Sequence, residues 1–253
     1  MEISWIVTDL DRTLLRTDKT VSDYTAEVFR RCREKGIRVV AATARQSSAL
    51  SMVGHIGFDG MVLSNGAQVV ADGRTVARSV IDAGAVRQVI NGILREDPSA
   101  WVSLIANGEH YCNYDVASAW EKIEYVHTDF SRVPNVIADK IGVGLKDGNW
   151  QRFLAYLPPQ LYIQSCDGDA LAFIMHRDAT KGNGVLRLAQ EWGLDPRSAV
   201  CFGDDHNDLS MFAVCGCSVA MQNAIDEVKA AADEVCAGSD DDGVAHWLEE
   251  HLL

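Results

Sequence analysis

Two aspartates follow the first apolar run of the chain. Asp9 and Asp11 come directly after Ile3–Thr8, a short segment of the kind that forms a buried parallel strand. Because ligands of open α/β sheets bind at the carboxyl ends of the strands, both carboxylates could approach one bound group. One could attack while the other transfers a proton, which is the division of labour that phosphoryl transfer to water needs. A turn with solvated acidic side chains is the alternative interpretation of this pair.

A second acidic group follows a later predicted strand, at 199–203. It is Gly203-Asp204-Asp205-His206-Asn207-Asp208. Hard cations such as Mg²⁺ prefer carboxylate oxygens, with water and substrate phosphate in the remaining positions. Asp204 and Asp208, together with Asp9, could supply such a set of ligands. An Asx turn that caps a helix beginning at Asp208 would explain the same residues, and both interpretations can hold together.

Two more residues could bind an anion near these acids. Thr43 ends a predicted strand at 38–43, where its hydroxyl could donate to a phosphate oxygen or serve only the local structure. Lys181 opens a predicted helix, and a cation at a helix N-terminus opposes the helix dipole. Its position is better explained if an anion is held there, although a solvated lysine remains the alternative. His206 could be interpreted as a general base, but the carboxylates already fill the acid and base roles.

The elements that must position these residues alternate between strands and helices in the first and last thirds of the chain. We expect a doubly wound α/β fold with a mostly parallel, Rossmann-like core sheet. The predicted strands are 3–8, 38–43, 61–64, 199–203 and 218–221, and the predicted helices are 22–36, 47–55, 184–192, 208–214, 223–232 and 243–251, with Asn223 as the cap of the fifth.

The middle of the chain has a different pattern. A helix at 85–95 precedes two hairpins, which turn at Asn107-Gly108 and Asp167-Gly168. Between them we expect helical segments at 116–126 and 149–157 and a strand at 136–145. Antiparallel pairs with helices indicate an inserted α+β domain. The expected division is a core of residues 1–81 and 177–253 and an insert of residues 82–176.

Composition excludes several classes of protein. The formal net charge is −13 without a dense Lys/Arg block, which argues against binding to nucleic acid or to an anionic membrane. No apolar run is long enough to span a bilayer, and the first residues lack the basic and apolar regions of a signal peptide. Seven scattered cysteines indicate free thiols and a cytoplasmic location. Cys215-Gly-Cys217 could suggest zinc, but further ligands are missing nearby, so packing explains the pair better.

The order of the motifs is more specific than any one of them. An Asp-x-Asp pair, a Thr, a Lys and the Gly203–Asp208 group resemble the haloacid dehalogenase superfamily. The likeness is greatest to its Cof-type phosphatases, which carry a large cap between the second and third motifs, and it covers essentially the whole chain. Further matches are Ser64-Asn65-Gly66-Ala67, Asn223-Ala224, Val228-Lys229, Ala232-Asp233 and Asp242-Gly243-Val244-Ala245.

This resemblance implies catalytic roles. Asp9 would be the nucleophile that forms an aspartyl-phosphate. Asp11 would be the general acid for the leaving alcohol and then the base that activates water. Thr43 and Lys181 would hold the transferring phosphoryl oxygens.

The resemblance also implies a Mg²⁺ site. Asp9 and Asp204 would be ligands together with the main-chain carbonyl of Asp11, and Asp208 would be a further carboxylate of the site. Asn207 would orient the site and the substrate.

Other positions leave alternatives open. Arg45 could bind substrate or be a surface residue at the start of a helix, and Asn65 could bind substrate or serve the turn before Gly66. Members of the family often carry Gly where Arg12 and Ala44 stand here. Arg12 could contact substrate or point to solvent.

The function expected from the sequence is Mg²⁺-dependent hydrolysis of a small phosphorylated metabolite, with sugar phosphates as the leading class and the insert as a lid. A phosphomutase or a dehalogenase could use the same scaffold, although a dehalogenase does not need the carboxylates of Asp204 and Asp208. A non-catalytic binding protein would be favoured by loss of Asp9, Asp11 or Lys181, and all three are present. The oligomeric state is left open.

Overall fold

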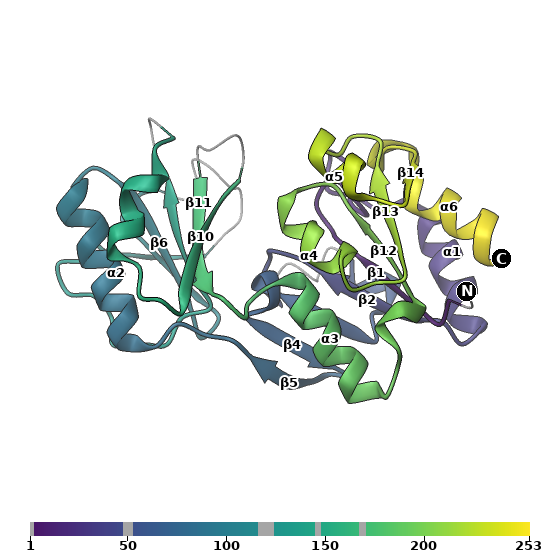
Figure 1. The fold of residues 1–253 in the computed structure, drawn as a ribbon, viewed down its shortest axis with the longest axis horizontal. Helices are drawn as coiled ribbons and strands as arrows, with labels where there is room; N and C mark the ends of the chain where they lie inside the picture. Colours follow the sequence, from purple (N-terminus) through teal and green to yellow (C-terminus); the bar gives the residue numbers. More distant parts are fainter. Residues whose placement is uncertain (1–2, 48–52, 116–123, 145–147, 167–170) are drawn as a thin grey trace. The chain divides into compact units, whose positions relative to one another are not determined.

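The chain forms two compact units in the computed structural model, which describes residues 3–47, 53–115, 124–144, 148–166 and 171–253 (Figure 1). Unit 1 comprises Met1–Arg78 and Ala179–Leu253, and unit 2 comprises Ser79–Asp178. Each unit has its own apolar core.

Unit 1 is built on a largely parallel sheet. Within the described residues the strand order is β14-β13-β12-β1-β2-β3-β4-β5. The parallel strands are β1 (Trp5–Thr8), β2 (Arg38–Ala42), β3 (Gly60–Leu63), β12 (Ala199–Gly203), β13 (Cys217–Met221) and β14 (Glu234–Cys236), and the antiparallel edge is β4 (Gln68–Ala71) and β5 (Arg74–Arg78). The strands β1 and β12 are buried at every position, which is why they form continuous apolar runs in the sequence.

Helices cover both faces of this sheet. The helices α1 (Asp23–Glu34) and α6 (Gly243–Leu252) lie together on one side, and α3 (Lys181–Trp192) and α4 (Leu209–Phe212) lie on the other (Figure 1). Ser22 caps α1 by accepting a hydrogen bond from the amide of Thr25, as expected for a helix that begins there. The remaining helix of the unit is α5 (Asp226–Ala231), and short 3₁₀ helices occupy Gly54–Ile56, Ser64–Gly66, Pro196–Ser198, His206–Asp208 and Ser239–Asp241.

Unit 2 is an α+β module. Its described strands form a sheet in the order β10-β11-β9-β6-β7-β8. They are β6 (Trp101–Ala106), β7 (Glu109–Cys112), β8 (Val126–His127), β9 (Lys140–Gly144), β10 (Leu161–Cys166) and β11 (Leu171–His176). The helix α2 (Ala83–Glu96) and the 3₁₀ helix Trp150–Tyr156 supply apolar side chains to the core of this unit, together with alternate residues of the strands.

The fold class predicted from the sequence is confirmed: a doubly wound parallel core and a second sheet with its own helices. Three local predictions differ. Asn223 does not cap α5, because Ile225 is the residue before its first turn. Val126 belongs to strand β8 and not to a helix, and the rest of the helix predicted at 116–126 lies largely outside the described residues. The helix predicted at 208–214 begins with a separate 3₁₀ turn.

Strand β14 was not predicted, because it is short and two of its three residues are exposed. The helix predicted at 47–55 falls mostly on residues that the structure does not describe. In the part of the chain that is described, no helix is both long and apolar enough to cross a membrane.

Candidate active site

The carboxyl ends of three parallel strands meet at one edge of the sheet in unit 1. Strand β1 pairs with β12 through Thr8 and Phe202, and with β2 through Thr8 and Ala41. The residues that follow these strands therefore leave the sheet side by side. They are Asp9 after β1, Thr43 after β2 and Asp204 after β12.

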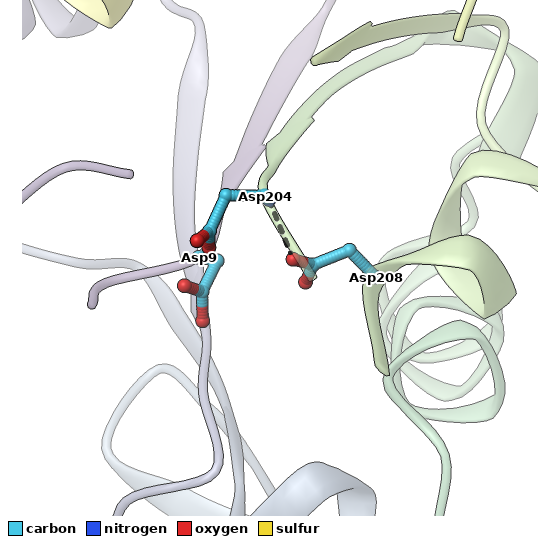
Figure 2. A group of neighbouring side chains, drawn as sticks. All are labelled: Asp9, Asp204 and Asp208. Atoms are coloured by element: carbon cyan, nitrogen blue, oxygen red, sulfur yellow. Dashed lines mark hydrogen bonds between the residues drawn. The ribbon is translucent and has the colours of Figure 1, made fainter. Parts of the chain in front are cut away.

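Three carboxylates form a buried cluster at this edge. Asp9, Asp204 and Asp208 each offer an oxygen that lies within 4.8 Å of those of the other two (Figure 2). The Oδ2 atom of Asp208 accepts hydrogen bonds from the amides of Asp204 at 2.8 Å and Asp205 at 3.1 Å. The 3₁₀ turn His206–Asp208 thus folds the loop back and returns Asp208 to the end of β12.

Lys181 is the cation of this cluster. Its side chain is fully buried, and its Nζ atom donates to Oδ1 of Asp9 and to Oδ1 of Asp208, each at 2.6 Å. Lys181 is the first residue of α3, so these carboxylates provide the anionic partner that its position at a helix N-terminus requires.

Two glycines fix the backbone at Lys181. Gly66 has a φ of +101°, and a Cβ atom there would lie 2.3 Å from the carbonyl oxygen of Thr180. A Cβ atom on Gly182 would lie 2.1 Å from the carbonyl oxygen of Ser210 at the start of α4. The start of α3 is therefore packed backbone to backbone against the turn Ser64–Gly66 and the first residues of α4.

The electrostatics of the cluster follow from this burial. Burial raises the pKa of Asp9 well above its ordinary range, and repulsion from Asp208 and Asp204 adds to it against the attraction of Lys181. Burial and then Asp208 raise the pKa of Asp204 to about 7. Burial alone would lower the pKa of Lys181, but attraction to Asp208 and Asp9 raises it above its ordinary value. The raised pKa values of Asp9 and Asp204 mean that the surrounding positive charge is too small to offset the cost of burying these carboxylates in their ionised form.

Asp11 lies in a different environment at the rim. Its side chain is 35% exposed and accepts hydrogen bonds from Arg45, Nε at 2.5 Å and Nη2 at 2.6 Å, and from Nζ of Lys19 at 2.9 Å. Burial would raise the pKa of Asp11, but these hydrogen bonds outweigh it and lower the pKa to about 2. Asp9 and Asp11 therefore have opposite pKa shifts although they are separated by one residue.

Polar groups from β2, β3 and the acidic loop complete the site. The Oγ1 atom of Thr43 is buried and accepts a hydrogen bond from the amide of Arg45 at 3.1 Å. The amide of Asn65 donates to the carbonyl of Thr43, and Asn207 donates from Nδ2 to Oδ1 of Asn65 at 3.0 Å. Asn65 has a φ of +57°, which suits the turn proposed for it, and its side chain also reaches the acidic loop.

The structure thus gathers the residues singled out from the sequence, and it adds two that sequence reasoning missed. Thr13 donates from Oγ1 to Oδ1 of Asp204 at 3.2 Å, and Lys19 donates from Nζ to Oδ1 of Asp11. Arg12, for which the sequence left contact with substrate or solvent open, forms an ion pair with Asp204. Thr13 could have been found, because it stands two residues after Asp11 in the first motif, whereas nothing in the local sequence marks Lys19. His206 does not join the cluster and lies beside the exposed Glu227.

Comparison with known proteins places these residues in a family context. The sequence model of the haloacid dehalogenase-like hydrolases matches residues 6–248. A Haemophilus influenzae protein is 30% identical over 261 residues, which cover 97% of each chain. The 5-amino-6-(5-phospho-D-ribitylamino)uracil phosphatase YbjI of Escherichia coli is 28% identical over 274 residues, covering 100% of this chain and 97% of that protein. The solved structure of BT4131, a sugar phosphatase of subclass IIB, has the same fold, with a TM-score of 0.85 at 21% identity over 98% of both chains.

Proposed function

This chain belongs to the haloacid dehalogenase-like hydrolases, and we propose that it removes phosphate from a small phosphorylated metabolite with the help of Mg²⁺. Family membership confirms the enzyme class predicted from the sequence, a phosphatase. One observation carries the proposal: the buried cluster of Asp9, Asp204 and Asp208 with Lys181 at the carboxyl edge of the sheet.

The donor set of this cluster fits a divalent metal. The three buried carboxylates face one buried ammonium group, which contacts two of them, and the largely exposed guanidinium of Arg12, so negative charge is still in excess when all of the acids are ionised. Oxygen ligands suit a hard cation such as Mg²⁺. In this proposal Asp9 and Asp204 hold the ion with the main-chain carbonyl of Asp11, and Asp208 completes the carboxylate set. When bound, the ion would neutralise charge on the carboxylates and on the phosphoryl group.

The residues of the chain divide the chemistry between them. A carboxylate oxygen of Asp9 attacks phosphorus, the bond from phosphorus to the leaving oxygen breaks, and Asp11 gives its proton to that oxygen. Water then attacks the aspartyl-phosphate, Asp11 accepts the proton from the water, and inorganic phosphate leaves Asp9. Lys181 has three N–H donors and uses two on Asp9 and Asp208, which leaves one for a phosphoryl oxygen. Thr43 would hold another of these oxygens from the end of β2.

Arg45, Asn65 and Asn207 complete the proposed substrate contacts. The guanidinium of Arg45 donates two hydrogen bonds to the carboxylate of Asp11, so it lies beside the group that is proposed to exchange a proton with the substrate. Asn65 and Asn207 are linked to each other, so each fixes the orientation of the other's amide. We propose that these amides orient the substrate and the acidic loop.

For the substrate class we propose sugar phosphates. The description of BT4131 as a sugar phosphatase supports this class, and the substrate named for YbjI carries its phosphate on a ribityl chain. We also propose a cytoplasmic location, because the six cysteines whose side chains the structure describes are free and scattered. We propose that unit 2 reads the non-phosphate part of the substrate, because every candidate catalytic residue belongs to unit 1. Replacing residues 83–175 with a short Gly/Ser linker should then spare hydrolysis of 4-nitrophenyl phosphate but abolish discrimination among metabolites. A folded core that still ranked metabolites as the full chain does would contradict this role.

A substrate screen tests the function. The purified chain is incubated with sugar phosphates, nucleotides, phosphorylated cofactors and 4-nitrophenyl phosphate, and released inorganic phosphate is measured. Release should require Mg²⁺, stop with EDTA and return when Mg²⁺ is restored. Transfer of phosphate within a sugar without release would identify a mutase instead.

A matched pair of variants locates the metal. Asp204→Asn removes a carboxylate of the cluster and should abolish the response to Mg²⁺. Asp205→Asn is the control, because Asp205 lies outside the cluster and Asn caps the following turn equally well. Undiminished hydrolysis after thorough chelation would rule out the metal.

A further inference from the structure

Arg12 has a backbone conformation that favours glycine. Its φ is +57°, in the left-handed region, where a side chain is unfavourable. The chain nevertheless carries a long cationic side chain at this position, immediately after Asp11. Such local strain is often retained where the side chain has a task.

Asn223 holds both the side chain and the backbone of Arg12 through reciprocal hydrogen bonds. Nη2 of Arg12 donates to the carbonyl oxygen of Asn223 at 3.1 Å, and Nδ2 of Asn223 donates to the carbonyl oxygen of Arg12 at 2.7 Å. Asn223 is itself fixed, because its Oδ1 accepts the amide of Ser239 at 2.9 Å. The guanidinium therefore has a defined position although 60% of the side chain is exposed.

From this position Arg12 faces one oxygen of Asp204. Its Nε atom lies 3.6 Å from Oδ2 of Asp204, whose side chain is only 6% exposed. The other oxygen, Oδ1, accepts the hydroxyl of Thr13 at 3.2 Å. Asp204 is thus oriented by a buried hydroxyl on one side and attracted by a fixed cation on the other.

We propose that Arg12 competes with the divalent metal for Asp204 and thereby lowers the affinity of the acidic cluster for that metal. This inference rests on the proposed function, in which Asp204 is a metal ligand. A bound dication repels a fixed guanidinium nearby, and it also draws the charge of Asp204 away from the arginine. Removal of Arg12 would not release Asp204, because the hydrogen bond from Thr13 remains. Loss of repulsion therefore outweighs loss of orientation, and the metal should bind more tightly.

Calorimetric titration of the metal-free full-length chain with MgCl₂ tests this competition. Arg12→Gln removes the charge and keeps an uncharged polar side chain, while Nδ2 of Asn223 can still donate to the carbonyl of residue 12. We expect its Kd for Mg²⁺ to fall by about threefold to tenfold at low ionic strength, since an exposed charge acts through a strongly screening solvent. The difference should shrink in about 0.5 M salt, where the screening length is only a few ångströms. Arg12→Lys, which keeps the charge, should stay nearer the wild type.

Control variants separate charge from folding. Arg12→Gly relieves the left-handed backbone and should also tighten binding, which covers the case that Arg12→Gln folds poorly. Arg30→Gln removes the same charge from an exposed position on α1 and should leave Kd unchanged. Asp204→Asn should abolish the titrated site, which shows that the cluster is the site measured.

The two proposals fail in different ways. If the wild type binds Mg²⁺ at the Asp204-dependent site but Arg12→Gln and Arg12→Gly bind it equally or more weakly, the competition is refuted and the proposed function stands. If the wild type binds no Mg²⁺ at this site, the metal of the proposed function is refuted and the competition with it.

Discussion

The guanidinium of Arg45 holds the carboxylate of Asp11 through two hydrogen bonds, Nε to Oδ2 at 2.5 Å and Nη2 to Oδ1 at 2.6 Å. Asp11 is the proposed proton donor and acceptor, and this contact stabilises its ionised form. The base role in the second half of the reaction needs that form, whereas the acid role in the first half needs a proton. The contact between Arg45 and Asp11 must therefore change when a substrate with a poor leaving group reacts.

Arg45→Gln should move the acidic limb of the pH–rate profile to higher pH. Without the arginine, the pKa of Asp11 rises from about 2 toward its ordinary value of 3.8, so protonation begins at a higher pH and removes the base. The measurement is kcat for 4-nitrophenyl phosphate between about pH 2.5 and pH 6, because this leaving group does not need the acid. Lys19→Gln should shift the limb in the same direction but less, since Lys19 makes one hydrogen bond. Superimposable limbs in all three proteins would contradict the control of Asp11 by these cations.

Asp9→Asn and Asp11→Asn should fail differently. Asp9→Asn removes the nucleophile, so neither turnover nor a phospho-enzyme should be detectable with any ester. Asp11→Asn removes proton transfer, which should lower kcat for an alkyl phosphate by about 10²–10⁴-fold and for 4-nitrophenyl phosphate by less. The measurement is kcat for both esters, together with acid-quench trapping of the phospho-enzyme. Wild-type turnover by Asp9→Asn would exclude covalent catalysis at this residue.

Gly66→Ala should destabilise the chain and impair catalysis together. The new methyl group would lie 2.3 Å from the carbonyl oxygen of Thr180, so the backbone before Lys181 must move. We expect a loss of about 3 kcal/mol in the free energy of unfolding, from backbone strain and overpacking combined. The checks are urea unfolding monitored by circular dichroism and kcat for 4-nitrophenyl phosphate.

Gly73→Ala is the matched control for that variant. Gly73 has a φ of +79°, but a Cβ atom added there would meet no other atom within 4 Å, so only backbone strain of about 1 kcal/mol should result. Its kcat should equal that of the wild type. Equal losses of stability and activity in the two variants would show that contact with Thr180 does not position Lys181.

Arg16→Gln should reduce stability at neutral pH but not in acid. Arg16 donates to both oxygens of Asp242, and Ser22 and Thr25 donate to one of them. Burial would raise the pKa of Asp242, but these hydrogen bonds lower it below its ordinary value of 3.8. A lowered folded-state pKa means that the carboxylate contributes stability above its unfolded pKa, and that this contribution is lost as pH falls through the folded value.

The expected result is a deficit in unfolding free energy of about 1 kcal/mol at pH 7 that declines as the pH falls below 3.8. The measurement is the urea midpoint at pH 7 and at a series of acidic pH values, with Arg30→Gln as a control for the loss of one exposed arginine. A deficit that persists in acid would mean that Arg16 acts through packing and not through the charge of Asp242.

The sequence was sufficient to predict that the acidic residues lie close together, because their proximity follows from the topology of the sheet. Asp9, Thr43 and Asp204 each follow an apolar run, and parallel strands bring their carboxyl ends to one edge. Lys181 was accessible because it stands at a helix N-terminus with no acidic residue in the first turn. The order of the motifs along the chain, which resembles that of the haloacid dehalogenase superfamily, indicated that these residues belong to one site.

Other contacts depend on loop conformation, which spacing does not determine. The pairing of Lys19 with Asp11 needs the left-handed backbone at Lys19, which has a φ of +66°. Asn223 carries a good capping side chain, but that side chain is used on Arg12 and Ser239 instead. A sequence pattern names the residues that can cap or pair, whereas tertiary contacts decide which partner each one takes.

The close approach of Gly66 to Thr180 allows the sequence of unit 2 to change during evolution without a change in the position of Lys181. Thr180 and Lys181 closely follow Asp178, the last residue of unit 2, so the returning chain contacts the turn after β3 before it reaches Lys181, the proposed phosphate-binding lysine. The structural effects of changes in length or sequence within residues 79–178 need not extend past this contact between Gly66 and Thr180. We therefore expect lineages of this enzyme to adopt new substrates by exchanging parts of the insert, while the geometry around Lys181 is inherited unchanged.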